Sequence, residues 1–258
     1  MSLLETKEVS INFGGLWAVK DVDFKIEARE IVGLIGPNGS GKTTFLNIIS
    51  GIYRASQGTV LLQGENITGL RPYKIFQRGM ARTYQSSRLC WDLSVADNIL
   101  MGLYTKQKSS LADIILRPRR ADREIYENLE ECLDMLSYFN PHLLGRRYEL
   151  TKNIPHIDRR RIEISRALVG HPAILLLDEP TAGLNDEETM SMMDDIRKIK
   201  EKLRDICIII IEHDMQVMAR VPQRIIVFNA GQKIAEGLYD EIVHNDAVIK
   251  AYLGGAAV

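Results

Sequence analysis

The sequence has few cysteines and no long hydrophobic run. Its 258 residues include three cysteines, Cys90, Cys132 and Cys207, which lie far apart and lack metal-ligand spacing. We therefore expect buried, reduced thiols and neither a disulfide framework nor a zinc site. The longest apolar runs, Ala173–Leu177 and Ile206–Ile211, have the length of strands. Any membrane association is therefore expected to come through a partner.

An excess of charge of one sign is also missing. The formal net charge is -1, so no overall field favours nucleic acid, and we predict no nucleic-acid partner. The first residues, Met1–Glu8, lack the charged-then-apolar layout of a signal peptide. The composition, 45% hydrophobic and 26% charged, is typical of a globular domain. The length suits one domain with room for an inserted subdomain.

What the sequence does contain is a glycine-rich phosphate-binding pattern. It follows the apolar run Ile31–Ile35, which predicts a buried strand, and precedes Phe45–Ile49, which is apolar at helical spacing. This context distinguishes a phosphate loop from an ordinary glycine-rich turn, because backbone N–H groups and the helix start can point at phosphate oxygens. The pattern consists of Gly36, Pro37, Asn38, Gly39, Ser40, Gly41, Lys42, Thr43 and Thr44. We expect Lys42 to reach the β- and γ-phosphates and the Thr43 hydroxyl to bind Mg²⁺.

Two further strand ends carry residues suited to hydrolysis. Asp178 and Glu179 follow the apolar run Ala173–Leu177. A carboxylate there can hold Mg²⁺, and Glu179 can accept a proton from the attacking water. His213 follows the apolar run at Cys207–Ile211, so we expect it beside the same γ-phosphate. A plain helix start and a structural histidine are the alternatives.

The order of patterns predicts an α/β fold. Near the N-terminus, Asp21–Ile26 alternates polar and apolar residues, as an antiparallel strand does. Residues from about 86 to 168 have helical spacing, including a helix from Arg159 to Leu168, and after them strands alternate with helices. We therefore predict a mostly parallel sheet, an N-terminal antiparallel β subdomain and an inserted α-helical subdomain at about 86–168, within a single domain spanning 1–258.

A basic stretch, Lys106–Arg123, interrupts the helical region. We interpret it as a solvated connection between helices, with a contact surface for acidic lipid or a partner as the alternative.

Taken in order, these motifs resemble those of the ATP-binding cassette (ABC) ATPases. The shared motifs are the phosphate loop, the loop glutamine Gln85, the acidic pair Asp178–Glu179, the turn Ala182–Asn185 and the switch histidine His213. The resemblance implies a P-loop NTPase core with ATP and Mg²⁺ as cofactors. It also implies that Gln85 contacts Mg²⁺ or the attacking water, and that Phe13 stacks on adenine.

Three segments resemble the ATPase subunits of branched-chain amino acid importers in particular: Ala81–Gln85, Lys106–Arg123 and the ending Asp246–Gly254. Urea and amide importers and lipopolysaccharide-export ATPases share parts of this pattern. The resemblance implies a peripheral subunit at the cytoplasmic face of the inner membrane. It would work with a second cassette and with permease subunits that contact the Gln85 region. Ser86–Trp91 is the expected contact segment, with Leu89 and Trp91 as core residues the alternative. A non-transport or regulatory ABC ATPase is the alternative class.

One motif departs from the family pattern. The signature, typically Leu-Ser-Gly-Gly-Gln, is replaced by Ile154–Asp158. In the family this segment binds the γ-phosphate held by the other subunit. Pro155 has neither a hydroxyl nor an N–H, Ile157 adds bulk, and Asp158 adds negative charge. We hypothesise an asymmetric heterodimer whose partner supplies an intact signature, with a slow homodimer as the alternative.

Overall fold

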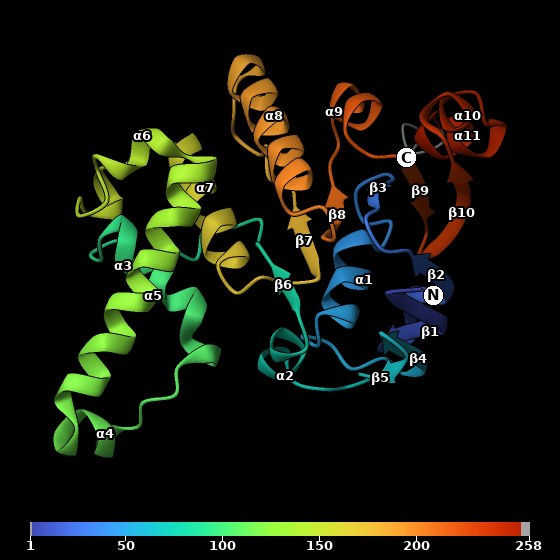
Figure 1. Ribbon diagram of the computed structural model, residues 1–258. Helices are drawn as coiled ribbons and strands as arrows, with labels where there is room; N and C mark the ends of the chain where they lie inside the picture. The colour runs from blue at the N-terminus through green and yellow to red at the C-terminus, as the bar shows by residue number, and fades with distance from the viewer. Residues whose placement is uncertain (1, 254–258) are drawn as a thin grey trace.

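Two sheets and a group of helices form the chain in the computed structural model, which describes residues 2–253 (Figure 1). The first sheet is antiparallel, with strand order β2-β1-β4-β5. Its strands are β1 (Leu4–Phe13), β2 (Leu16–Ile26), β4 (Gln57–Leu62) and β5 (Glu65–Asn66). The alternating stretch at 21–26 lies in β2, as its pattern predicts.

The second sheet has six strands in the order β10-β9-β3-β8-β7-β6. All its neighbours pair in parallel except β10 with β9. The strands are β3 (Ile31–Ile35), β6 (Met80–Arg82), β7 (Ile174–Asp178), β8 (Cys207–Ile211), β9 (Arg224–Asn229) and β10 (Gln232–Gly237). Every residue of β3, β7 and β8 is buried, because helices or the first sheet cover both faces.

Helix α1 (Lys42–Ile49) packs between the two sheets. Its Phe45 ring lies 5.5 Å from the Phe24 ring of β2 and 5.3 Å from the Phe228 ring of β9. The opposite face of the parallel sheet is covered by later helices and by the helix α7 (His156–Leu168). Those later helices are α8 (Asp186–Lys202), α9 (Met215–Arg220), α10 (Tyr239–Val243) and α11 (Asp246–Leu253). The parallel sheet therefore holds α1, and the phosphate loop before it, from one side.

The middle of the chain forms a helical group, which Figure 1 shows in green and yellow beside the sheets. Its members are α3 (Val95–Leu100), η1 (Met101–Lys106), α4 (Leu111–Leu116), α5 (Pro118–Phe139), α6 (Pro141–Leu144), η2 (Thr151–Asn153) and α7 (His156–Leu168). They enclose a small core of their own around Ile99, Leu136 and Ile162. A short helix, α2 (Pro72–Gln77), precedes β6. The predicted fold class is confirmed.

Several local expectations need correction. Helix α7 begins at His156 rather than Arg159, because Pro155 occupies the N-cap position and can precede a helix. The stretch 106–123 is not only a connection, since it contains α4. Cys132 and Cys207 are buried, but Cys90 is half-buried. Gly254, the last residue of the C-terminal pattern, lies outside the described residues.

No helix within residues 2–253 has both the length and the apolar character needed to cross a membrane.

The packing of η1 against α7 depends on a glycine. A Cβ on Gly102 would lie 2.1 Å from the Arg166 carbonyl oxygen and 2.6 Å from a Val169 methyl carbon. We expect Gly102→Ala to lower the thermal midpoint by about 5 °C, because backbone cannot yield as a side chain can. Gly145→Ala is the matched control, since nothing lies within 4 Å of its Cβ position. Equal thermal midpoints for the two variants would contradict this account of the packing.

Candidate active site

The phosphate loop adopts a conformation that depends on glycine. Gly36, Gly39 and Gly41 have φ of 147°, 76° and 102°, in the region that L side chains avoid. A Cβ on Gly36 would also lie 2.1 Å from the Phe228 carbonyl oxygen. The loop lines a cavity of about 180 Å³ together with Ala18, Glu179 and His213.

Lys42 is buried at the base of this cavity. Its Nζ donates to the Gly36 carbonyl at 2.7 Å and to the Pro37 carbonyl at 3.1 Å. Burial lowers the pKa of Lys42, while the nearby carboxylates of Glu179 and Asp178 act in the opposite direction. The ammonium is therefore held inside the loop by carbonyl groups that an incoming phosphate can replace.

Glu179 faces the phosphate loop and is held from two sides. His213 Nε2 lies 2.8 Å from its Oε1, and Gln85 Nε2 donates to its Oε2 at 2.7 Å. The backbone of Glu179 has φ of 50°, unusual for a residue with a side chain, and its N–H donates to the Ile211 carbonyl at 3.0 Å. The structure thus brings Glu179 together with His213, 34 positions later in the sequence, and with Gln85, 94 positions earlier.

The sequence analysis missed the partner of Asp178. Arg82 NH2 lies 2.8 Å from Asp178 Oδ2, and both side chains are buried. Arg82 NH1 also donates to Asn47 Oδ1 and Ser50 Oγ of the α1 region, each at 2.8 Å. Arg82 lies in the segment Ala81–Gln85, which the sequence analysis singled out for its family resemblance. Only the β6–β7 register shows that its charge meets that of Asp178.

The residues predicted to bind metal have the right chemistry for Mg²⁺. Thr43 lines the cavity beside the phosphate loop, and Asp178 keeps Oδ1 free of the Arg82 ion pair. Within residues 2–253, no group of three His, Cys, Asp or Glu side chains could hold a metal by itself. A few oxygen donors beside a phosphate-binding cavity suit Mg²⁺, which normally takes most of its ligands from phosphates and water.

Phe13 lies apart from the cavity, at the end of β1. Its ring is half exposed and meets the Tyr53 ring edge-on, with centroids 5.4 Å apart. An exposed aromatic face can stack on a base, so the adenine contact stays a prediction.

The signature position lies at the start of α7. Pro155 and His156 are exposed there, whereas Asp158 is buried. Asp158 Oδ1 lies 2.8 Å from His142 Nε2 and 3.0 Å from Arg161 NH1. The expectation that Asp158 places a negative charge toward phosphate is therefore wrong, since the charge is turned inward and paired. The other difference at the signature is unaffected, because Pro155 still offers neither a hydroxyl nor an N–H to a phosphate.

His156 touches the turn Ala182–Asn185 within the same chain. A Cβ added to Gly183 would lie 3.3 Å from His156 Cε1. Burial lowers the pKa of His156, and the guanidinium groups of Arg160 and Arg159 lower it further, so the imidazole is mainly neutral at pH 7.

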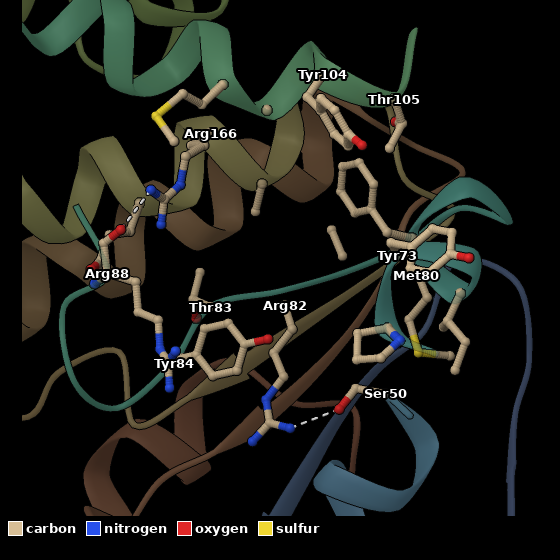
Figure 2. Close-up of a pocket in the computed structure, with 18 residues that line it drawn as sticks. Ser50, Tyr73, Met80, Arg82, Thr83, Tyr84, Arg88, Tyr104, Thr105 and Arg166 are labelled. Atoms are coloured by element: carbon tan, nitrogen blue, oxygen red, sulfur yellow. Dashed lines mark hydrogen bonds between the residues drawn. The ribbon is translucent and has the colours of Figure 1, made fainter. Parts of the chain in front are cut away.

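A second cavity, about 360 Å³, opens between α2, β6, η1 and α7 (Figure 2). Figure 2 shows Arg82 and Arg88 close to Tyr84, with guanidinium carbons 5.1 and 4.7 Å from its ring centroid. Tyr73 and Tyr104 line the groove from α2 and η1. We call this cavity the groove.

The segment that follows Gln85 divides between the groove and the helical core. Arg88 lines the groove, while Leu89 is buried among the helices. Trp91 is partly exposed, with the Arg159 guanidinium 5.0 Å from its ring centroid.

The Arg82–Asp178 pair yields a stability prediction. Arg82→Met leaves a buried carboxylate without its counter-ion, so we expect the free energy of unfolding to fall by about 3–5 kcal/mol. Arg78→Met is the matched control, because the Arg78–Glu65 pair is exposed and such pairs contribute about 1 kcal/mol or less. Urea unfolding followed by circular dichroism measures both. Similar losses for the two variants would show that burial of the Arg82 pair is not decisive.

Comparison with known proteins agrees with this geometry. Residues 19–182 match the ABC transporter family, and residues 232–258 match a family described as branched-chain amino acid ATP-binding cassette transporter. The chain is 37% identical to the branched-chain amino acid transport ATP-binding protein BraF of Pseudomonas aeruginosa, over 98% of each chain. It is also 37% identical to LivG of Escherichia coli K12, over 98% of each chain.

Solved structures show the same architecture. A nucleotide-free ATP-binding cassette from an ABC transporter has a TM-score of 0.84 and 25% identity, covering 98% of this chain and 99% of that one. An ADP-bound cassette has a TM-score of 0.83 at the same identity and the same coverage. From its family match, its full-length relatives and its phosphate loop facing Glu179, we conclude that the chain belongs to the ATP-binding cassettes of ABC transporters, the ATPases that power transport.

Proposed function

We propose that this chain binds and hydrolyses ATP to drive import of branched-chain amino acids or a related small solute such as urea or an amide. The observation that carries the proposal is Glu179, held by Gln85 and His213 across a cavity from the phosphate loop. The likeness to BraF and LivG supports the solute class.

In the proposed mechanism the phosphate loop binds the polyphosphate of ATP. The N–H groups of Gly36–Thr44 point at phosphate oxygens, and Lys42 exchanges its carbonyl partners for the β- and γ-phosphates. Glu179 orients the attacking water and accepts its proton. Phe13 stacks on adenine.

His213 and Gln85 hold the Glu179 carboxylate and, in the proposed mechanism, also lie beside the γ-phosphate. Their hydrogen bonds hold the carboxylate in place before the nucleotide arrives, so less reorganisation is needed at reaction. Thr43, Asp178 and Gln85 would hold Mg²⁺, which supplies positive charge to the phosphates.

We place the chain as a peripheral subunit at the cytoplasmic face of the inner membrane. The groove lies next to Gln85 and is lined by aromatic and basic side chains, which suits a helix from a permease subunit. The helical subdomain at about 86–168 forms one wall of the groove through η1 and α7. Occupancy of the groove and the state of the nucleotide can therefore be linked through the Gln85 segment.

The altered signature supports pairing with a different cassette. Pro155 offers no N–H and no hydroxyl to a γ-phosphate on the partner, and Ile157 adds bulk. Because Asp158 is paired inside the chain, electrostatic repulsion does not add to these losses. A heterodimer with one productive site is the arrangement we favour, and a slow homodimer is the alternative.

One relative favours a second candidate function. The lipopolysaccharide export system ATP-binding protein LptB of Haemophilus influenzae is 32% identical over 98% of each chain. An export ATPase would keep the same catalytic residues, so the permease partner distinguishes the two functions.

Glu179→Gln tests hydrolysis. The amide cannot accept a proton, so we expect turnover to fall by about 10²–10⁴-fold while the dissociation constant for ATP changes little. Phosphate release and binding of a fluorescent ATP analogue measure the two quantities. Glu201→Gln, on the exposed face of α8, serves as the control and should retain wild-type turnover. Unchanged turnover in Glu179→Gln would support a regulatory subunit without catalytic duty.

Mixing tests the heterodimer. We expect little hydrolysis by the purified chain alone and a rise of at least about 10²-fold with a cassette that carries an intact Ser-Gly-Gly-Gln signature, since a missing phosphate donor costs that much. The rise should vanish when the added cassette lacks its signature serine. High activity of the chain alone would mean that the segment Ile154–Asp158 functions despite its chemistry.

A further inference from the structure

Glu212 is a buried carboxylate that the mechanism does not yet use. It follows β8 and directly precedes His213, and its side chain is 4% exposed. Within residues 2–253, no lysine or arginine forms an ion pair with it. Burial raises the pKa of Glu212, and the nearby charge of Glu179 raises it further. A glutamate in such a place costs folding free energy, so its contacts indicate what it does.

The contacts of Glu212 join two segments of the active site. Its Oε1 accepts from the Thr181 N–H at 2.8 Å and from the Thr181 hydroxyl at 2.6 Å. Along the chain, Glu212 is bonded directly to His213. Glu212 therefore links the segment that begins with Glu179 to the segment that carries His213.

Thr181 connects the hydrogen bonds accepted by Glu212 to the turn Ala182–Asn185. Its carbonyl accepts from the Leu184 N–H at 3.0 Å, and the Glu179 carbonyl accepts from the Ala182 N–H at 3.1 Å. Glu179 itself has the unfavourable φ of 50°. A residue in such a conformation persists only when its surroundings hold it, and Thr181 lies two positions further along the same chain.

We propose that Glu212 is a positioning residue, which holds the segment 179–184 against His213 through Thr181 and so sets the place of the Glu179 carboxylate. This inference rests on the proposed hydrolysis of ATP. Glu212 does not touch the phosphate cavity, so its effect falls on turnover rather than on nucleotide binding.

Two substitutions test the contact. Glu212→Gln keeps an acceptor oxygen but removes the negative charge, which weakens the two hydrogen bonds from Thr181. Thr181→Val removes the hydroxyl at nearly constant shape. We expect each to lower turnover by about 10-fold or more, because small misplacements of catalytic groups cost that much. Affinity for an ATP analogue should stay within about twofold of wild type, since the phosphate loop is untouched. Thr181→Ser, which keeps the hydroxyl, is the matched control and should retain most of the turnover.

The double variant distinguishes a shared contact from two separate effects. If both residues act through one contact, the double variant is no slower than the slower single variant. The proposal would be overturned if the fold-loss of turnover in the double variant equalled the product of the two single losses. Turnover within twofold of wild type in both single variants would also overturn it. If Glu212→Gln fails to fold, the turnover of Thr181→Val can be compared with that of Thr181→Ser, and this comparison tests the same contact.

Hydrogen exchange provides a readout that does not depend on catalysis. The Thr181 amide and the 182–184 amides should exchange faster in Glu212→Gln, while those of α1 keep wild-type protection. Unchanged exchange at Thr181 would overturn the proposal. Failure of the wild-type chain to hydrolyse ATP with any partner cassette would instead refute the proposed function, and the exchange result would still decide whether Glu212 holds this segment.

Discussion

The parallel pairing of β3, β8 and β7 is the constraint on which the site depends. The carboxyl ends of the three strands meet at one edge of the sheet. Ile211 of β8 is paired with Leu34 of β3 on one side and with Asp178 of β7 on the other. The phosphate loop, the acidic pair and His213 each follow one of these strands, so the ladder alone brings them together. Because all three strands are buried on both faces, their register is fixed by packing as well as by hydrogen bonds.

The arrangement also links the groove to Asp178, a predicted Mg²⁺ ligand. Arg82 ends β6, and its side chain lines the groove beside Tyr84. The same guanidinium pairs with Asp178 and bonds to Asn47 and Ser50. One side chain is thus shared by the groove, the strand that carries Asp178 and the region of the helix that follows the phosphate loop.

The sheet core could be predicted from the sequence, as could the strand ends at which the candidate site residues lie, because these signals are local. Uniformly apolar strands and a glycine pattern with fixed spacing can be recognised without knowing what packs against them. The Arg82–Asp178 pair could not be found this way, since it joins residues that meet only through strand register. The position of Asp158 was misjudged for a related reason: Arg161 is one turn away and was visible, but His142 comes from another helix.

The inward turn of Asp158 has a consequence for how this signature can change. Asp158 joins α6 to α7 through His142, and Arg161 extends the connection to Asp195 and Ser191 of α8. A substitution at position 158 therefore disturbs the packing of three helices before it affects any nucleotide. A change of Asp158 to the glutamine of the family signature would remove the carboxylate that His142 and Arg161 share. Contacts among α6, α7 and α8 thus constrain position 158 independently of any role toward nucleotide.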